Sequence, residues 1–235
     1  MYERKGFPIV NKGSLKKIAL THSLRCDSKQ FEAQFIEYQK MLDNEDFFYL
    51  GELLPKPLIK GIQPFYIEGT EGVPVINTLS IQQMRINTEA CRYISEEDFE
   101  SISVNRKLKK NDVLLTLDGG TSIGKPVLFQ LEGDYTVDSH VAILRPVGIS
   151  SLALVYLLAS PLGQMHFSKA ESGASGQTSV TEEDLRRFKF PQKTLLKLER
   201  ASEILDTLQI RLQQEKAAID KKIDTAWIDF IKKIT

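Results

Sequence analysis

The final segment of the chain, residues 194–235, contains neither glycine nor proline. Apolar residues recur in it at intervals of seven: Leu198, Leu205, Leu212, Ile219 and Ala226. This spacing is typical of a helix with an apolar stripe along one side. Because an α-helix rises 1.5 Å per residue, roughly 40 residues would span about 60 Å. The sequence therefore predicts one long helix that the preceding domain cannot cover completely.

The stripe on this helix is expected to contact another helix. Its members are Leu198, Leu205, Leu208, Leu212, Ile219, Ile223, Trp227 and Phe230. Glu215 and Lys222 interrupt the second seam position, so an ideal two-stranded zipper is not expected. Two arrangements remain open. Either the stripe pairs with a second copy of the chain about a two-fold axis, or an N-terminal helix around Phe31, Phe35 and Ile36 folds back over it.

The rest of the chain divides into two further parts. Residues 1–46 are expected to be helical, with Asp27 and Ser28 as a possible N-cap. Residues 47–192 contain short apolar stretches between glycines and prolines, which is typical of strands. The strands are expected at 47–54, 73–79, 112–117, 126–131 and 139–144, with helices at 152–159 and after Thr181. The predicted fold class is therefore α/β of the α+β type: a strand-rich domain, flanking helices and a coiled-coil-type helix at residues 193–235.

Charge and cysteine content exclude several classes of protein. The chain has 31 basic and 31 acidic residues, so any contact with nucleic acid must come from local patches. Cys26 and Cys91 are far apart in sequence and lack the spacing of a disulfide framework or a zinc site. Neither a signal peptide nor an apolar run long enough to cross a bilayer is found. A cytoplasmic protein without a metal is expected.

A glycine-rich segment at residues 118–125 follows the strand expected at 112–117. From Gly119 to Lys125 it matches most of the nucleotide-binding pattern GxxxxGK, but Pro126 stands where that loop needs a hydroxyl for magnesium. A strand-like sequence then follows, where the nucleotide loop requires a helix. Two interpretations remain open: a hairpin connection, or a loop that presents Thr121, Ser122 and Lys125 to a phosphate backbone.

A second loop of small residues lies at 172–179, just before the helix start at Thr181. Ser175, Thr178 and the backbone could contact phosphates, and Gln177 could make a bidentate contact to adenine. A plain flexible loop is an equally good interpretation. The three histidines, His22, His140 and His166, show no metal-ligand spacing.

Two groups of basic residues could be solvated surface or could contact DNA. The run at residues 106–110 is typical of a solvated face. The basic residues between Arg186 and Lys197 are equally consistent with solvated surface and with a contact to DNA or a partner.

The order of motifs along the chain resembles one half of a type I restriction-modification specificity subunit. The segments that carry the resemblance are residues 25–31, 50–53, 60–61, 72–76, 108–125, 138–146, 156–160, 173–178 and 185–191, followed by the long helix. No single one of these motifs is specific for the family, but their order and spacing taken together are. In this family the full subunit carries two target recognition domains and two antiparallel helices, whereas this chain offers one of each. It therefore resembles either a half-subunit that dimerises or a solitary relative.

The resemblance implies a function. Such a subunit binds a split sequence of double-stranded DNA and directs a separate adenine methyltransferase subunit, within a restriction system that acts in phage defence. The chain itself would have no catalytic centre and no cofactor, because S-adenosylmethionine and ATP would bind to the partner subunits. The residues expected to contact DNA are Lys60, Arg85, Thr121, Ser122, Lys125, His140, Ser175, Gln177 and Thr178. Two other functions stay open: a solitary DNA-binding protein with the same fold, and an interaction module that acts through the long helix.

Overall fold

Strand β7 (Val113–Thr116) lies at the centre of the main sheet, and all four of its side chains are buried. The computed structural model describes residues 33–234 except 43, 83, 120–121 and 171–177. The main sheet has the strand order β2-β10-β7-β8 and is antiparallel throughout. The other three strands are β2 (Ile59–Lys60), β10 (Val141–Leu144) and β8 (Pro126–Leu128).

Both faces of this sheet are buried, which explains its nearly continuous apolar sequence. One face presents Leu115 and Ala142 to a cluster that includes helices α4 (Ser151–Ala159) and α5 (Pro161–Ala170). The other face presents Leu114 and Ile143 to Ile76, Ile81 and Val137. The strand-rich α+β fold expected from the sequence is confirmed.

Smaller sheets and short helices complete the domain. A three-stranded sheet has the order β6-β3-β9, in which β3 and β9 are parallel. Its strands are β3 (Val73–Ile76), β6 (Arg92–Ile94) and β9 (Thr136–Val137). Hairpin β4 (Ile81–Gln82) to β5 (Arg85–Ile86) lies beside β8, and β1 (Phe47–Tyr49) pairs with β11 (Lys189–Pro191). The remaining short elements are η3 (Leu50–Glu52), η4 (Thr88–Ala90), α3 (Glu96–Ser101), η5 (Val104–Arg106) and α6 (Glu182–Arg186).

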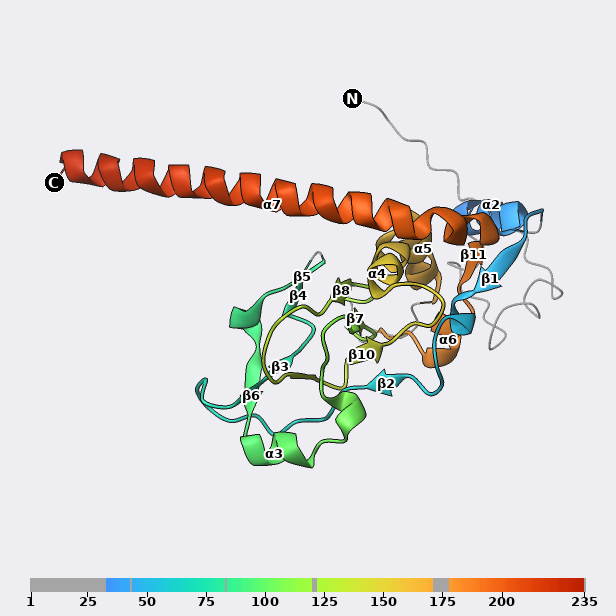
Figure 1. Cartoon of the computed structure of the whole chain (residues 1–235), viewed down its shortest axis with the longest axis horizontal. Coiled ribbons are helices and arrows are strands. Elements are labelled where there is room, and N and C mark those ends of the chain that lie inside the picture. Colours follow the sequence, from blue (N-terminus) through green and yellow to red (C-terminus); the bar gives the residue numbers. More distant parts are fainter. Residues whose placement is uncertain (1–32, 43, 83, 120–121, 171–177, 235) are drawn as a thin grey trace, which may run out of the picture.

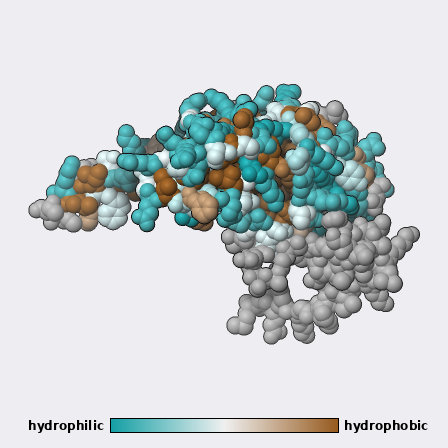
Figure 2. Space-filling view, turned by 90° about the horizontal axis from the view of Figure 1, so that it is seen from below, coloured by the Kyte–Doolittle hydropathy of each residue, from teal (hydrophilic) through white to brown (hydrophobic). Residues whose placement is uncertain are grey.

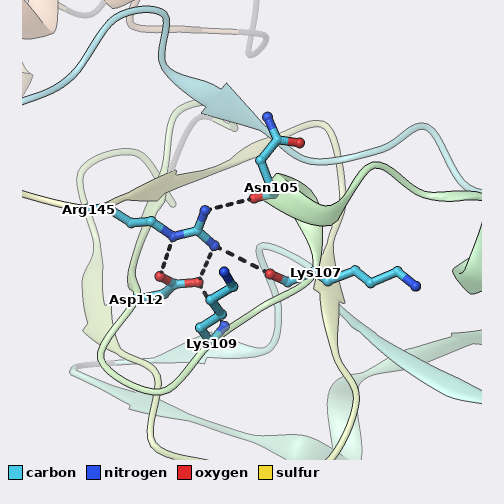
Figure 3. A network of polar contacts seen from close by, with 5 residues as sticks. All are labelled: Asn105, Lys107, Lys109, Asp112 and Arg145. Atoms are coloured by element: carbon cyan, nitrogen blue, oxygen red, sulfur yellow. Dashed lines mark hydrogen bonds and ion pairs between the residues drawn. The ribbon is translucent and has the colours of Figure 1, made fainter.

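A bidentate ion pair holds η5 against the main sheet (Figure 3). Arg145 Nε lies 2.7 Å from Asp112 Oδ1, and Arg145 Nη2 lies 2.8 Å from Asp112 Oδ2. The remaining guanidinium donors reach the backbone oxygens of Asn105 and Lys107. The Asp112 carboxylate also accepts the backbone N–H of Lys109. This buried carboxylate is therefore fully partnered, as a charge in a protein interior must be.

Helix α7 (Gln192–Ile234) is a single continuous helix that runs away from the domain (Figure 1). Its first turns pack on α4. Ser150 at the start of α4 donates both its N–H and its hydroxyl to the Glu199 carboxylate, each at 2.5 Å. Tyr156 donates to Gln209 Oε1 at 3.0 Å. Every residue of α7 from Ile210 to Ile228 is exposed, so the domain covers only the first part of the helix.

Leu198 was expected in the stripe that contacts another helix, but it does not belong to the exposed stripe. It is 8% exposed and packs into the domain's own core with α4 residues. On a straight helix, residues seven apart drift by about 20° per repeat. This small rotation keeps Leu205 and Leu212 near the side of Leu198, but Leu198 lies on the turns that pack on α4, whereas Leu205 and Leu212, one and two repeats later, are exposed.

Helix α2 (Ala33–Leu42) does not cover the stripe. Phe35 is 3% exposed, and α2 lies beside β11, near the start of α7. The seven stripe residues beyond Leu198 remain between 46% and 63% exposed. The fold-back arrangement is therefore wrong for the described part of the N-terminal segment. Phe31 and the possible N-cap at Asp27 and Ser28 lie outside the described residues.

Candidate nucleic-acid interface

Hydrogen bonds among the described residues close the connection between β7 and β8. Gly119 adopts a φ of +104°, and its carbonyl accepts the N–H groups of Ser122 and Ile123. The Thr116 hydroxyl donates to the Ser122 carbonyl and accepts the Lys125 N–H at 3.0 Å. Gly124 has a φ of +77° and lies so close to the Phe167 ring that a side chain there would collide with it. Strand β8 follows Lys125 directly and pairs antiparallel with β7, so the segment joins two strands and the helix that a nucleotide loop requires is not formed here.

The end of the second polar loop is joined to the first. The Gly119 N–H donates to the Thr178 carbonyl at 3.1 Å, and Val180 donates to Leu117 at 2.9 Å. Asp118 and Ser179 form an antiparallel bridge between these two bonds. Two segments some 60 residues apart in sequence thus lie side by side. Thr121, Ser175 and Gln177 lie outside the described residues.

A turn at residues 138–140 brings His140 to the same place. His140 Nδ1 lies 3.3 Å from Asp118 Oδ2, and the His140 carbonyl accepts the Leu117 N–H. The turn is held by Asp138, whose carboxylate accepts the His140 N–H at 3.0 Å. Burial raises the pKa of Asp138, while this hydrogen bond opposes the shift. The imidazole itself is about half exposed and points toward the joined loops.

The lysine and arginine residues expected to contact DNA lie on separate elements. Lys60 is exposed on the edge strand β2, opposite Ala142. Arg85 is exposed on the β4–β5 hairpin, where its guanidinium donates to Gln82 Oε1 at 3.5 Å. Lys125 ends the first loop. Among the described residues, no carboxylate forms an ion pair with any of these three cations.

The other basic groups have structural partners. Lys107 and Lys110 pair with Glu100 and Glu132, in keeping with a solvated face. Arg186 is buried and donates to the carbonyls of Gly51, Leu54 and Pro55 as well as to Glu182. Lys193 pairs with Glu45. A DNA contact by Arg186 would require breaking this buried network, so its role is internal.

Sequence reasoning missed three polar residues of the cluster. Asp118 joins both loops and the histidine, and Ser139 donates to Gln63 Oε1 at 2.9 Å. Gln63 thereby links the loop after β2 to the turn at 138–140. The acidic residue directly before the glycines was the available signal for Asp118. Nothing in the local sequence places Gln63 near Ser139, because they are 76 residues apart.

A second surface lies on α7. Figure 2 shows brown, apolar side chains spaced along the protruding helix between hydrophilic ones. Leu208, Ile219 and Phe230 fall eleven residues apart, as do Leu212 and Ile223. Eleven residues per three turns is close to the natural period of an α-helix, so this stripe runs almost parallel to the helix axis. The sequence analysis had missed further exposed apolar residues on α7, namely Ile204, Ile210, Ile228 and Ile231.

None of the histidine, cysteine, aspartate and glutamate side chains of the described residues gather in a group that could hold a metal ion. No described helix is both long enough and apolar enough to cross a membrane.

The fold and its surfaces define an α+β domain with polar loops joined at one end and a long helical extension. No protein-family model matches the chain, and no curated protein matches it. Its structural neighbours include specificity subunits of type I restriction-modification systems. The HsdS subunit from Thermoanaerobacter tengcongensis is 19% identical with a TM-score of 0.49, and the match covers 74% of this chain and 39% of that chain.

Two further solved structures give similar figures. A chain from a study of complex assembly and conformational transition of the type I system is 17% identical with a TM-score of 0.48, covering 79% of this chain and 46% of that one. The S subunit from M. genitalium is 14% identical with a TM-score of 0.47, covering 73% and 41%. The chain spans less than half the length of each of these proteins.

Proposed function

We propose that this chain is a DNA sequence-recognition subunit of a type I restriction-modification system. It has no catalytic centre of its own and directs a separate adenine methyltransferase subunit to its target. The observation that carries the proposal is the junction of the two polar loops at Asp118 and Ser179, with His140 beside it. The motif order that resembles the family places these same segments in the recognition domain.

The chemistry of the junction suits a DNA duplex. Ser122, Thr178 and His140 offer hydrogen-bonding groups, of the kind that contact both phosphates and base edges. Lys60, Arg85 and Lys125 have no carboxylate partners among the described residues. Cations that are not neutralised internally can release counterions from DNA, which supplies much of the affinity of such complexes. The zero net charge of the chain does not oppose this, because only local charge acts at a contact.

The proposal includes a homodimer formed through α7. The exposed stripe gives each helix an apolar side that the domain leaves in water, at a cost of roughly 25 cal/mol per Å². Charge favours an antiparallel pair, because residues 203–215 carry three acids and one base, whereas residues 216–233 carry five bases and three acids. Antiparallel packing places each acidic half against the basic half of the partner. The dimer would hold two identical recognition domains apart, so that they read two inverted half-sites.

The decisive experiment couples recognition to a covalent readout. The chain is expressed together with the methyltransferase subunit of its own locus, and methylated adenines are mapped across the host genome. A single motif with two inverted halves and a fixed spacer is expected. Methylation that is identical with and without the chain would overturn the proposal.

Two measurements separate the competing functions. Salt-sensitive binding of the purified chain to duplex DNA, without any association with the methyltransferase, would instead favour a solitary DNA-binding protein. Association with a protein partner through α7, with no affinity for DNA at any salt concentration, would favour an interaction module.

A further inference from the structure

Phe65 is 88% exposed, the highest value among the exposed large apolar residues of the described chain. It lies in the loop between β2 and Ile67. A single exposed apolar residue is common on protein surfaces and needs no explanation by itself. The backbone that carries Phe65 and the groups near it indicate that this residue has a role in binding.

The loop is anchored at both ends. Gly61 and Ile62 donate to the carbonyls of Val141 and Val137, at 3.1 and 3.0 Å. A side chain at Gly61 would collide with the backbone of Asp138, so this end of the loop is packed against the turn that carries His140. At the other end, Ile67 donates to the Tyr93 carbonyl at 2.9 Å. The exposed ring is therefore carried by a loop whose two ends are fixed by hydrogen bonds.

Proline restricts the loop further. Pro64 directly precedes Phe65 and fixes its own φ, which reduces the number of backbone conformations near the apex. A ring presented in this way loses little conformational entropy when it becomes buried in a complex. The loop therefore preorganises the exposed ring for binding.

One neighbour of Phe65 in sequence belongs to the candidate nucleic-acid interface, and another contacts an exposed cation. Two residues before Phe65, Gln63 accepts a hydrogen bond from Ser139, which directly precedes His140. On its other side, the Arg92 guanidinium lies 3.5 Å from the centre of the Tyr66 ring. Arg92 is itself exposed. The exposed Phe65 thus lies in a loop whose neighbouring residues contact a hydrogen-bonding patch on one side in sequence and a cation on the other, which suits a polyanion with stacked aromatic rings.

We propose that the Phe65 ring inserts as a wedge between adjacent base pairs of the bound duplex. Arg92 and the Gln63–Ser139 patch would then contact the DNA backbone on the two sides of the inserted ring. This inference rests on the proposed function and deepens it. Proteins that bend DNA insert phenylalanine and other apolar side chains into base steps in this manner, at the cost of partial unstacking. Because a mismatch has already weakened the stacking, the wedge should favour a mismatched duplex over a matched one.

This preference can be tested without knowing the recognised sequence. The full chain is titrated with two fluorescent 30-base-pair duplexes that differ only in a central pair of mismatches, and binding is followed by anisotropy. The wild-type chain is expected to bind the mismatched duplex at least about fivefold more tightly. Phe65→Ala should bind both duplexes equally, and Phe65→Trp should restore the preference.

The matched control is Val147→Ala, which also removes an exposed apolar side chain. Val147 follows the opposite end of β10 from His140 and bonds to the Leu53 carbonyl, so its loss should leave the preference unchanged. Thermal unfolding should show that Phe65→Ala folds like the wild type, since an exposed ring contributes little packing. Any loss of preference is then a loss of the wedge.

The outcomes separate the wedge from the proposed function. If the wild-type chain binds DNA with no preference, or Phe65→Ala keeps the wild-type preference, the wedge is overturned while DNA recognition stands. If Phe65→Ala keeps that preference but no longer associates with the methyltransferase subunit, the ring is a protein contact and the wedge is likewise overturned. If the wild-type chain binds neither duplex, both proposals fall.

Discussion

Tyr156 and Gln209 share a hydrogen bond of 3.0 Å that marks the point where α7 leaves the domain. Gln209 is the last described residue of the helix that the domain partly covers. Beyond it, side chains bond within the helix: Arg211, for example, pairs with Glu215, and the Thr225 hydroxyl donates to the Lys221 carbonyl. The surface that α7 leaves open for a partner therefore includes its residues beyond Gln209, along which the apolar stripe continues.

The first prediction concerns this association. The wild-type chain should have twice its monomer mass of 26.6 kDa by light scattering at micromolar concentration. Leu205→Glu/Leu212→Glu should reduce it to a monomer, because carboxylates would have to be buried in the stripe. Gln214→Glu, which adds a charge to another side of the exposed helix, should leave the dimer intact. A wild-type monomer, or a double variant that remains a dimer, would contradict the interface.

The second prediction tests the first loop. Lys125→Ala should weaken binding to all DNA sequences alike and should lower the slope of log K against log salt by about one. The backbone bonds of Lys125 to Thr116 do not involve the ammonium group, so the loop should keep its shape. Lys110→Ala removes the same charge from a residue paired with Glu132 and serves as the control. Equal effects of the two substitutions would mean that only net charge matters.

The third prediction concerns sequence discrimination. If Gln177 reads a base edge, Gln177→Ala should reduce the difference in binding free energy between target and non-target DNA by about 1–3 kcal/mol. Affinity for non-target DNA should change little. Competition binding with the methylated motif and a scrambled duplex measures both quantities. A uniform loss on both duplexes would assign Gln177 to the phosphate backbone instead.

The fourth prediction is a stability test of the ion pair in Figure 3. Arg145→Ala leaves the Asp112 carboxylate, 4% exposed, without its bidentate partner. The free energy of unfolding should fall by about 3–5 kcal/mol, measured by urea denaturation. Arg145→Gln/Asp112→Asn should lose less than the sum of the two single changes, because no unpaired charge is left behind. Additive losses would show that the two residues act independently.

The fifth prediction concerns pH. His166 stacks on Phe188 at a ring distance of 4.7 Å and donates through Nε2 to the Lys189 carbonyl. Burial, and further the charges of Lys169 and Lys189, lower the pKa of His166 to about 4, whereas the hydrogen bond to the Lys189 carbonyl opposes this shift. The unfolded chain binds this proton near pH 6.5 and the folded chain only near pH 4, so acidification across this window favours unfolding. The loss attributable to His166 should approach about 3 kcal/mol at pH 4.

His166→Gln separates this contribution from other groups. Glutamine can still donate to the Lys189 carbonyl but does not titrate, so its stability should depend less on pH between 6.5 and 4. Asp138, whose raised pKa acts in the opposite direction on acidification, is present in both proteins and cancels in the comparison. Parallel pH profiles of urea midpoints would show that His166 is not responsible.

Local patterns in the sequence predicted the elements that local chemistry determines. The helix start at Thr181 carries the expected capping box, in which Thr181 and Asp184 bond reciprocally. The absence of glycine and proline after residue 194 predicted α7, which begins two residues earlier, at Gln192. In both cases the deciding interactions join residues within a turn or two of helix. No information from distant segments was needed.

The missed features depend on distant contacts. Strand β2 exists because Ile59 and Lys60 pair with β10, more than 80 residues away. Phe65 would be assigned to the core from its residue type alone, and only the anchored loop shows that it is exposed. Leu198 was placed in the stripe by its heptad position, although the packing of α4 on α7 turns it inward. The partners of these residues, rather than their own chemistry, determine where they lie.

Strand β11 ends at Pro191 and α7 begins at the next residue, so the helix is joined to the β1–β11 pair without a loop. In a helix attached in this way, a change in length is always coupled to a rotation of the far end. Each residue inserted beyond Gln209 would advance the far end by 1.5 Å and rotate it by about 100°. Reach and angular direction therefore cannot change independently. Only insertions near whole turns, such as eleven residues for about 17 Å, lengthen the helix while keeping the orientation of whatever its far end holds.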